Sequence, residues 1–584
     1  MTEKWVVSAK KADFEYLAEK FGIDKVIARI IRNRDVISDE EFAEYLSEPS
    51  EPPKMSGQMK DLEKAADIIL EQISLGRKIR VIGDYDGDGV CATCILVKGI
   101  SLCGGDVSYV IPHRVYDGYG MNDDMIRDAE NDGIGCIVTC DNGISAEGPA
   151  ELAKELGITL VITDHHAVPY DEVDGERVEK IPVAAAVVNP QQKDCPYPFK
   201  GICGAVVALR VVECLLEKAG KSPSEIPDIY EMAAIATITD IMVLRGENRT
   251  LVKYGLKSMK NTVNLGLSAL IDNILPGREK FSGYDIGFIL GPTINASGRV
   301  DTAEKAEELF LTEDPARANA LAAELVELNT LRKSMTQEGI EAGLEIAAQY
   351  PEDKVLVIYQ PGLHESIAGL VAGRIRENTC KPAIVITDSE GGAKGSGRSI
   401  EAYCMIDELT RVKDLLSKFG GHPMAAGLSL PKENIALLRE RLLENSSLKD
   451  EDICRKISID VPMPFYYVTE RLISQLEVLE PFGNGNEKPV FALSGIEAKS
   501  ARILGKNRNV LSITARHEGR LYTMVRFGEP DIFLDYYRKK FSPADVENML
   551  EGRDNRILMD VTYYPQVNEF NGRRTIQFVI SAYR

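Results

Sequence analysis

Apolar and polar positions follow two different periods along this chain, and the changes of period divide it into regions. Residues 1–55 have helical spacing and end in a loop-forming run, SEPSEPPK, at 47–54. From residue 78 onward, short apolar runs alternate with helical segments, which indicates a parallel sheet with crossover helices. The predicted strands are 78–82, 107–111, 136–139, 159–163 and 184–188. The predicted helices are 90–101, 123–131, 147–156, 204–220 and 227–239.

The second half of the chain changes pattern twice more. Residues 315–350 contain few helix breakers and predict one long helix, and residues 351–455 return to an α/β pattern with strands at 355–359 and 383–387. Apolar segments at 511–515, 520–527, 557–564 and 575–581 are separated by Gly, Asn and Asp, as in a small β-barrel. We therefore expect an N-terminal helical segment (1–55), a parallel-sheet α/β domain (56–314), a connecting helix (315–350), a second α/β domain (351–455) and a small β-barrel (456–584).

Charge is distributed unevenly over these regions. The whole chain has 69 Lys+Arg against 90 Asp+Glu, a net charge of -21 that as a sum argues against nucleic-acid binding. Residues 456–584, however, carry 18 basic and 16 acidic residues, a net of +2. Basic residues interleaved with aromatic ones suit single-stranded nucleic acid, although a solvated charged face is the alternative. The candidate contacts are Lys499, Arg502, Lys506, Arg508, Arg516, Arg520, Tyr522 and Arg526.

Apolar runs such as 181–188 are much shorter than the roughly 18 residues that a membrane span needs, and no secretory leader pattern opens the sequence. The 11 cysteines are scattered, and we expect Cys91 and Cys94 to be buried thiols rather than a redox or zinc pair. A cytoplasmic protein without membrane contact is the expectation.

Acidic and imidazole side chains follow three of the predicted strands. Asp84, Asp86 and Asp88 come after the first strand, Asp141 after the third, and Asp164-His165-His166 after the fourth. Ligands of open parallel sheets bind beyond the carboxyl ends of the strands, so these groups are expected to converge. Mixed oxygen and imidazole donors suit two Mn²⁺ or Mg²⁺ ions, which would act together on a phosphoester.

Each piece of this pattern also has a structural explanation. The Asp-x-Asp-x-Asp-Gly run could be a calcium loop or a solvated turn, but its twelfth position is Ile95, which cannot supply the carboxylate of an EF-hand. A pair of histidines is often structural. The joint occurrence at three strand ends favours a metal site.

The order of the motifs along essentially the whole chain resembles the DHH phosphoesterase superfamily, named for the Asp-His-His that stands here at 164–166. Within it, the chain is similar to bacterial single-stranded-DNA-specific 5′→3′ exonucleases. The motifs are VIGDYDGDGV (81–90), TCDNGIS (139–145), TDHH (163–166), ATITDIMVLRGENR (236–249), GFILGPTINASGR (287–299), HESIAGLVAGR (364–374), GSGRS (395–399), FGGHPMAAGL (419–428) and PFGNGNEKPVF (481–491).

The resemblance implies roles for the acidic and histidine residues. The metal ligands would be Asp86, Asp88, Asp141, His165 and Asp240. Asp88 and Asp141 would bridge the two ions, and Asp141, His165 and His166 would be catalytic, with His166 against the scissile phosphate. Phosphatase relatives have a His where this chain has Ile82, so Asp84 either replaces that ligand or orients the site.

The same resemblance implies that the second α/β domain (351–455) binds substrate and that the barrel (456–584) is an oligonucleotide-binding (OB) fold that binds nucleic acid. His113 and Arg114, with Ser396 and Arg398, would recognise a terminal 5′ phosphate, and Asn295 and Arg299 would contact the phosphate beside the scissile one. Gly397 and His422 belong to glycine-rich segments where backbone can approach a phosphate. Each of these features also has a structural alternative. The Gly-Ser-Gly-Arg run could be an ordinary hairpin, Asn295 a turn residue, and Arg299 a solvated cation.

The implied activity is metal-dependent 5′→3′ degradation of single-stranded DNA to nucleoside 5′-monophosphates in repair and recombination. The implied cofactors are two divalent cations, with Mn²⁺ preferred or Mg²⁺, and the protein would act as a monomer assisted by a helicase and a single-strand-binding protein. Two alternatives stay open: a nanoRNase or cyclic-dinucleotide phosphodiesterase of the superfamily, which would ordinarily lack the barrel, and an inactive replication scaffold.

Overall fold

The computed structural model describes residues 3–53, 58–114, 116–570 and 572–584, which form two compact units. One unit holds residues 48–455, and the other combines residues 3–47 with residues 456–584.

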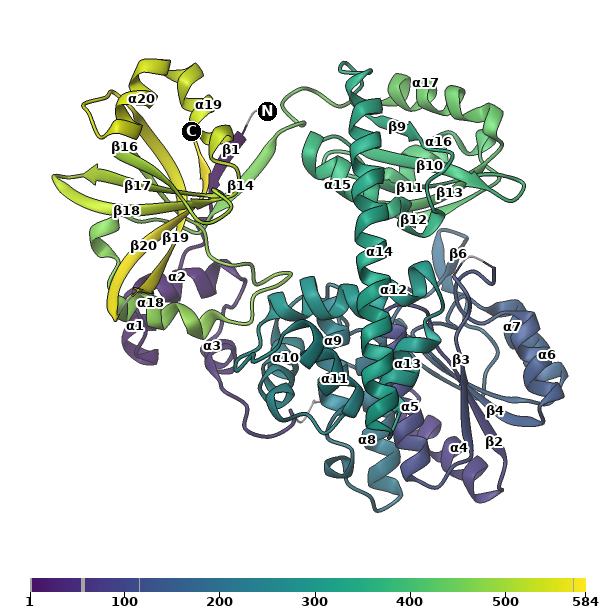
Figure 1. Cartoon of the computed structure of the whole chain (residues 1–584). Coiled ribbons are helices and arrows are strands. Elements are labelled where there is room, and N and C mark those ends of the chain that lie inside the picture. The colour runs from purple at the N-terminus through teal and green to yellow at the C-terminus, as the bar shows by residue number, and fades with distance from the viewer. Residues whose placement is uncertain (1–2, 54–57, 115, 571) are drawn as a thin grey trace. The chain divides into compact units, whose positions relative to one another are not determined.

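The first unit begins with a five-stranded parallel sheet of order β3-β2-β4-β5-β8, of which Figure 1 labels β2, β3 and β4. Its strands are β2 (Lys78–Ile82), β3 (Val107–Val110), β4 (Ile134–Cys140), β5 (Thr159–Thr163) and β8 (Ala186–Val188). The predicted strands are therefore confirmed within one or two residues. Because β2, β4 and β5 are neighbours in register, with Ile82 opposite Thr139 and Thr139 opposite Ile162, their carboxyl ends are level.

Helices cover both faces of this sheet, because its strands are apolar on both sides. On one face, β2 and β4 share a core with α4, α5, α8 and α9; on the other, β4 and β5 pack against α6 and α7. The helices are α4 (Leu62–Ser74), α5 (Gly87–Leu102), α6 (Asp123–Asn131), α7 (Glu147–Glu155), α8 (Gly204–Lys218), α9 (Ile229–Thr239), α10 (Gly246–Ser258), α11 (Leu265–Ile274), α12 (Gly291–Val300) and α13 (Glu304–Leu311). A hairpin of β6 (Tyr170–Val173) and β7 (Glu176–Glu179) was not predicted.

Helix α5 begins three residues earlier than the pattern predicted. Asp86 is its N-cap, and Asp86 Oδ1 accepts hydrogen bonds from the amides of Asp88 (2.9 Å) and Gly89 (3.2 Å). The cap rather than apolar periodicity sets the start, so Asp88 lies in the first helical turn.

The predicted connector is one helix, α14 (Pro315–Ala348), capped by Asp314. Its first half packs on α11, α12 and α13, and its second half on α15 (Ala368–Thr379) of the next domain (Figure 1). Gly339 and Gly343 make the second contact close, since a Cβ there would lie within 3 Å of Val371 and Ile375 side chains.

The second α/β domain has a five-stranded sheet of order β12-β13-β11-β10-β9, in which only β9 and β10 are parallel. Its elements are β9 (Leu356–Tyr359), β10 (Ala383–Ser389), β11 (Gly392–Arg398), β12 (Lys418–His422), β13 (Ala425–Leu430), α16 (Met405–Arg411) and α17 (Ile435–Asn445). The Gly-Ser-Gly-Arg run is therefore part of an interior strand, not a hairpin turn.

The second unit contains a closed five-stranded barrel of order β16-β17-β18-β20-β19, closed by pairing of β19 with β16. Its elements are β15 (Val461–Pro462), α18 (Glu470–Leu476), β16 (Phe491–Leu504), β17 (Val510–His517), β18 (Arg520–Phe527), α19 (Pro530–Lys540), α20 (Pro543–Glu551), β19 (Leu558–Phe570) and β20 (Arg573–Tyr583). The pattern did not predict β16, because register shifts against both neighbouring strands interrupt its alternation.

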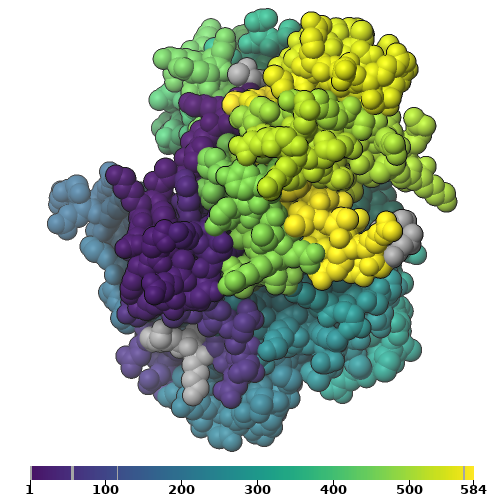
Figure 2. Space-filling model, turned by 90° about the vertical axis from the view of Figure 1, so that its left-hand side faces the viewer, coloured from purple at the N-terminus to yellow at the C-terminus, as the bar shows by residue number. Residues whose placement is uncertain are grey.

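Residues 3–47 belong to the same core as the barrel. Helices α1 (Phe14–Phe21), α2 (Lys25–Asn33) and α3 (Asp39–Leu46) bury apolar side chains against residues 461–580, and Figure 2 shows these purple residues lying against the green ones. The buried Arg34 donates to Asp460 at 2.6 Å. Strand β1 (Glu3–Val7), where only helices were predicted, pairs with β14 (Arg455–Ile459).

Two smaller expectations concern thiols and membranes. All eleven cysteines are free, and Cys91 and Cys94 are buried in α5, as predicted. Over the described ranges, none of the helices combines the length and apolarity needed to cross a bilayer.

Candidate active site

The carboxyl ends of β2, β4 and β5 bring the predicted metal ligands together. Three overlapping groups have ligand atoms within 4.8 Å of one another. They are Asp84 with Asp86 and Asp141, Asp88 with His165 and Asp240, and Asp141 with His165 and His166. Asp240 comes from the end of α9, which sequence order alone did not connect to the sheet.

His165 lies at the centre of this cluster and is largely buried. Its Nε2 is 3.1 Å from Asp141 Oδ1, 3.7 Å from Asp88 Oδ2 and 3.8 Å from Asp240 Oδ2. Burial lowers the pKa of His165, although Asp88 opposes the shift. The imidazole is therefore neutral near pH 7, the form that ligates a metal.

The amino end of α8 holds Asp88 in place. The amides of Gly204 and Ala205 donate to Asp88 Oδ2 and Oδ1, both at 2.7 Å. Gly204 also lies against Asp141, because a Cβ at this position would be 2.6 Å from Asp141 Cβ and 2.7 Å from its Oδ1. One glycine thus sets the spacing of two site carboxylates, and sequence analysis did not identify it.

Backbone geometry at the end of β4 aims Asp141 into the cluster. Asp141 has a left-handed φ of 60°, a conformation that asparagine and aspartate tolerate best among residues with a side chain. Asn142 fixes this turn, since its Nδ2 donates to Ile82 O (3.0 Å) and Cys140 O (2.9 Å). Tyr119 OH donates to Asp141 O at 2.8 Å.

The carboxylates repel one another in a buried site. Burial first, and neighbouring carboxylates second, raise the pKa of Asp84 and Asp141 well above the usual range and that of Asp240 to about 8. Asp84 Oδ1, Asp141 Oδ1 and Asp240 Oδ2 are buried with no hydrogen-bond partner. Orphaned buried oxygens beside imidazole are the donor set that a divalent cation satisfies, so the residues fit Mn²⁺ or Mg²⁺.

The first residue of the Asp-His-His motif faces away from the cluster. Asp164 is 1% exposed and accepts hydrogen bonds from the amides of Ile144, His165 and His166 and from His166 Nδ1 at 2.7 Å. Burial opposes protonation of His166, but the hydrogen bond to Asp164 outweighs it and raises the pKa of His166 to about 9. His166 is therefore a cation near pH 7, and Tyr119 OH lies 3.1 Å from its Nδ1.

Arginines gather beside the acidic cluster. Burial, with Arg114, Arg332 and Arg398 nearby, lowers the pKa of Arg299 to about 9. Burial and Arg114 likewise lower the pKa of Arg398, whose Nη1 donates to Ser396 Oγ at 3.0 Å. Positive charges held close together in a protein interior repel one another, and a bound anion such as a phosphate would relieve this repulsion.

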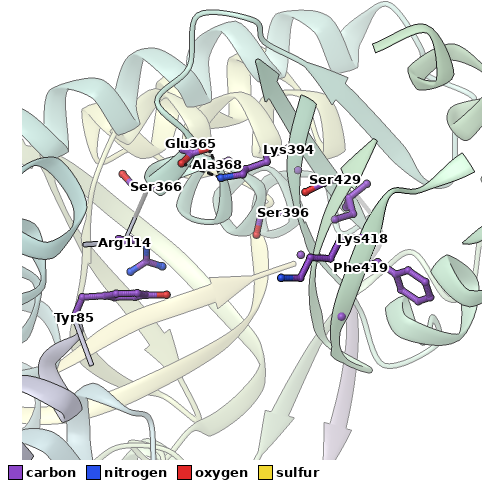
Figure 3. A pocket seen from close by; sticks show the side chains of 14 residues that line it. Tyr85, Arg114, Glu365, Ser366, Ala368, Lys394, Ser396, Lys418, Phe419 and Ser429 are labelled. Carbon is purple, nitrogen blue, oxygen red and sulfur yellow. Dashed lines mark hydrogen bonds and ion pairs between the residues drawn. The ribbon is translucent and has the colours of Figure 1, made fainter. Parts of the chain in front are cut away.

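The two α/β domains enclose a cavity of about 480 Å³ (Figure 3). Arg114 lines it, with its guanidinium 4.5 Å from the centre of the Tyr85 ring, and Ser396 faces it from β11. Sequence analysis missed Glu365, Lys394, Lys418 and Ser429, which complete much of the wall. It also missed Gly369 beside the cavity, where a Cβ would be 2.7 Å from Arg398 Nη2 and 2.9 Å from Ser396 Oγ.

Four other predicted phosphate contacts have different surroundings. Asn295 Oδ1 accepts from Gly87 N at 2.7 Å and so anchors the loop that bears Asp84, Asp86 and Asp88. The His113 ring stacks on Tyr116 at 4.5 Å. Gly397 faces the interior of its domain, where a Cβ would be 3.0 Å from Met405, and the exposed His422 is not part of the cavity wall.

Among the described residues, only some of the barrel side chains that were predicted to contact nucleic acid are exposed and free of ion pairs with neighbouring side chains. Lys499 and Arg516 both pair with Glu497, at 2.8 and 2.5 Å, while Arg502, Lys506, Arg508 and Arg520 are exposed. Tyr522 packs on Phe465 and Phe578 at 5.1 and 5.8 Å, so little of its ring is open to a base. Phe527 is 57% exposed.

Comparison with known proteins agrees with this description. The chain matches the DHH family N-terminal domain over residues 78–237 and the DHHA1 domain over residues 352–446, so fold and site define a DHH-type phosphoesterase. Residues 459–582 match the RecJ OB domain. The chain is 32% identical to the single-stranded-DNA-specific exonuclease RecJ of Bacillus subtilis, over 99% of this chain and 70% of that protein. The chain belongs to the RecJ family.

Two further relatives support this assignment. The Escherichia coli protein of the same name is 29% identical over 90% of each chain. The crystal structure of RecJ from Thermus thermophilus in complex with Mn²⁺ matches with a TM-score of 0.82 and 26% identity, over 100% of this chain and 80% of that one.

Proposed function

We propose that this protein is a divalent-metal-dependent exonuclease that degrades single-stranded DNA from its 5′ end to nucleoside 5′-monophosphates. The observation that carries the proposal is the position of a cluster of buried, partly orphaned carboxylates beside buried arginines in one unit. Such a site matches a phosphodiester whose charge needs cations on two sides. The name of the RecJ relatives supports the choice of single-stranded DNA as substrate.

The metal-holding residues would be Asp84, Asp86, Asp88, Asp141, His165 and Asp240. When bound, two divalent cations, preferably Mn²⁺, supply Lewis-acid stabilisation of the charge that develops on the scissile phosphate. The partnerless Asp84 Oδ1 favours a ligand role for this residue over a purely orienting one. Asp141 belongs to two of the three ligand groups, which suits a bridging position.

The chain's own groups bind and orient the strand. His166, protonated near neutral pH and held by Asp164, donates to an oxygen of the scissile phosphate. Arg114, Ser396 and Arg398 bind the terminal 5′ phosphate, which places the first phosphodiester at the carboxylates and sets the polarity. Water adds to phosphorus, the bond to the 3′ oxygen breaks, and the shortened strand keeps a 5′ phosphate for the next round.

Selectivity for single strands would come from shape. A strand would lie between the two α/β domains, and the passage would exclude a duplex by its width rather than read the bases. The barrel contributes backbone contacts through its exposed basic residues and a stacking surface at Phe527. We also propose that the protein acts in the cytoplasm as a monomer, with a helicase and a single-strand-binding protein supplying its substrate in repair and recombination.

The barrel and the intact ligand set separate this proposal from the alternatives. A nanoRNase or cyclic-dinucleotide phosphodiesterase has little use for a closed barrel with a net positive segment, and a scaffold has no need of partnerless buried carboxylates.

The test uses 5′-phosphorylated single-stranded and duplex DNA with Mn²⁺ or a chelator. We expect release of nucleoside 5′-monophosphates from the single strand only, with activity lost on chelation. Asp141→Asn should abolish release while retaining strand binding. Equal degradation of duplex, or release from the 3′ end, would contradict the proposal.

A further inference from the structure

The cavity between the α/β domains continues past the groups that face a terminal 5′ phosphate. Arg114 and Ser396 line it, but none of the metal-site carboxylates or histidines does. A strand whose scissile bond lies at the carboxylates and whose terminal phosphate lies at Arg114 and Ser396 therefore leaves the part of the cavity lined by Lys394, Lys418 and Ser429 unfilled.

The floor of this space lacks side chains. Ser396 is opposite Gly427 in the sheet, and Gly427 is opposite Gly420, so the three residues form one row across β11, β13 and β12. Cross-strand partners point to the same face, and a Cβ built on either glycine would meet nothing within 4 Å. A group longer than one phosphate can lie over this row.

The next row on the same face is cationic. Lys394 is opposite Ser429, and Ser429 is opposite Lys418, two residues along each strand from the first row. That separation is about 7 Å. Figure 3 shows the Lys394 and Lys418 amines directed into the cavity, and Lys394 is held by Glu365 at 3.1 Å. The cavity wall thus carries three cations and one carboxylate.

We propose that this cavity accepts a 5′-triphosphate, so that the protein also degrades strands that begin with a nucleoside 5′-triphosphate. The inference rests on the proposed exonuclease function. The α-phosphate takes the place of the terminal monophosphate, and the β- and γ-phosphates cross the glycine row to Lys394, Ser429 and Lys418. Water adds to the phosphorus of the first phosphodiester, its bond to the 3′ oxygen breaks, and a nucleoside 5′-triphosphate leaves.

The experiment compares a 5′-triphosphorylated with a 5′-monophosphorylated single-stranded dodecamer at constant free Mn²⁺, with released nucleotides separated by chromatography. We expect the wild type to degrade both at rates within about threefold and to release an intact nucleoside 5′-triphosphate from the first. Lys418→Ala should lower the ratio of triphosphate to monophosphate rates about tenfold, the value of one charge-assisted hydrogen bond. Lys413→Ala, an exposed lysine of the same domain outside the cavity wall, should keep the wild-type ratio.

The inference would be overturned if the wild type failed to degrade the 5′-triphosphorylated strand. It would also be overturned if Lys418→Ala kept the wild-type ratio of triphosphate to monophosphate rates. Either result would mean that the cavity does not hold the β- and γ-phosphates and instead accepts the terminal sugar and base. Binding of inorganic triphosphate and of inorganic phosphate, followed by calorimetry, separates this outcome from failure of the exonuclease function. If neither strand is degraded but Lys418→Ala weakens triphosphate binding about tenfold and phosphate binding less, the cavity assignment holds and the proposed function fails.

Discussion

Replacing Gly204 by alanine tests whether the amino end of α8 sets the geometry of the metal site. The added Cβ would lie 2.6 Å from Asp141 Cβ and 2.9 Å from Asp141 Cα, much closer than ordinary contact. The neighbouring atoms are backbone and a short side chain, which cannot rotate away. Either α8 moves away, which breaks the hydrogen bonds from its amides to Asp88, or Asp141 shifts within the cluster.

Two magnitudes follow from this overlap. Overpacking a buried position typically costs about 1–3 kcal/mol of unfolding free energy. A displacement on the order of 1 Å at reacting groups costs roughly 100-fold in rate. We therefore expect Gly204→Ala to reduce kcat on 5′-phosphorylated single strands about 100-fold and to weaken Mn²⁺ binding, while the unfolding free energy falls by only a few kcal/mol.

The assay combines steady-state release of nucleotides with a Mn²⁺ titration followed by thermal unfolding. Gly201→Ala is the matched control, because this glycine lies three residues upstream and a Cβ there meets nothing within 4 Å. If Gly204→Ala keeps kcat and Mn²⁺ affinity within twofold of the control, α8 does not set the spacing of the two carboxylates.

Three further predictions concern the phosphate pocket, the acidic cluster and the barrel. Gly369→Ala should raise KM for 5′-phosphorylated strands about tenfold by displacing the adjoining guanidinium, whereas Gly362→Ala, whose Cβ meets nothing, should not; equal KM values would contradict this. The pKa of Asp240 is raised from 3.8 to about 8, so the folded chain binds this proton more tightly than the unfolded one, and metal-free protein should lose stability as pH rises between these values. Thermal melts in chelator should show this slope and a smaller one in Asp240→Asn; identical slopes would refute the cause. Phe527→Ala should weaken binding of single-stranded DNA by about 1–3 kcal/mol and leave the melting temperature unchanged. Tyr522→Ala should mainly lower the melting temperature, because this ring packs inside the barrel. Binding titrations and thermal unfolding would distinguish the two effects.

Much of the site could be predicted because it depends on strand order. Parallel strands separated by helices place their carboxyl ends on one edge, so acidic and histidine residues after β2, β4 and β5 had to converge once those strands were neighbours. The long helix α14 could also be predicted from the sequence, because helical spacing without helix breakers is a local property. Strand β16 was not, since its bulges disrupt the alternation on which recognition depends.

Roles within the motifs could not be assigned from spacing. Asp164 stands beside His165 in sequence but is turned inward to hold the turn, while Asp240 reaches the cluster from a helix about 75 residues later. Tyr522 is flanked by exposed residues in sequence, yet it packs against the aromatic side chains of the barrel. Direction of a side chain depends on contacts with distant segments, which a local pattern does not contain.

Sequence by itself determined the five parallel strands of the first sheet, the long helix α14, the acidic and imidazole residues at three strand ends, and the basic segment of the barrel, because periodicity, turn chemistry and charge are local properties of the sequence. Only the tertiary structure decided that α8 holds Asp88, that Gly204 spaces it from Asp141, that residues 3–47 share a core with the barrel, and that Lys394 and Lys418 form one row across the second sheet. Each of these depends on contacts between residues far apart in the chain, whose geometry is set when the cores pack.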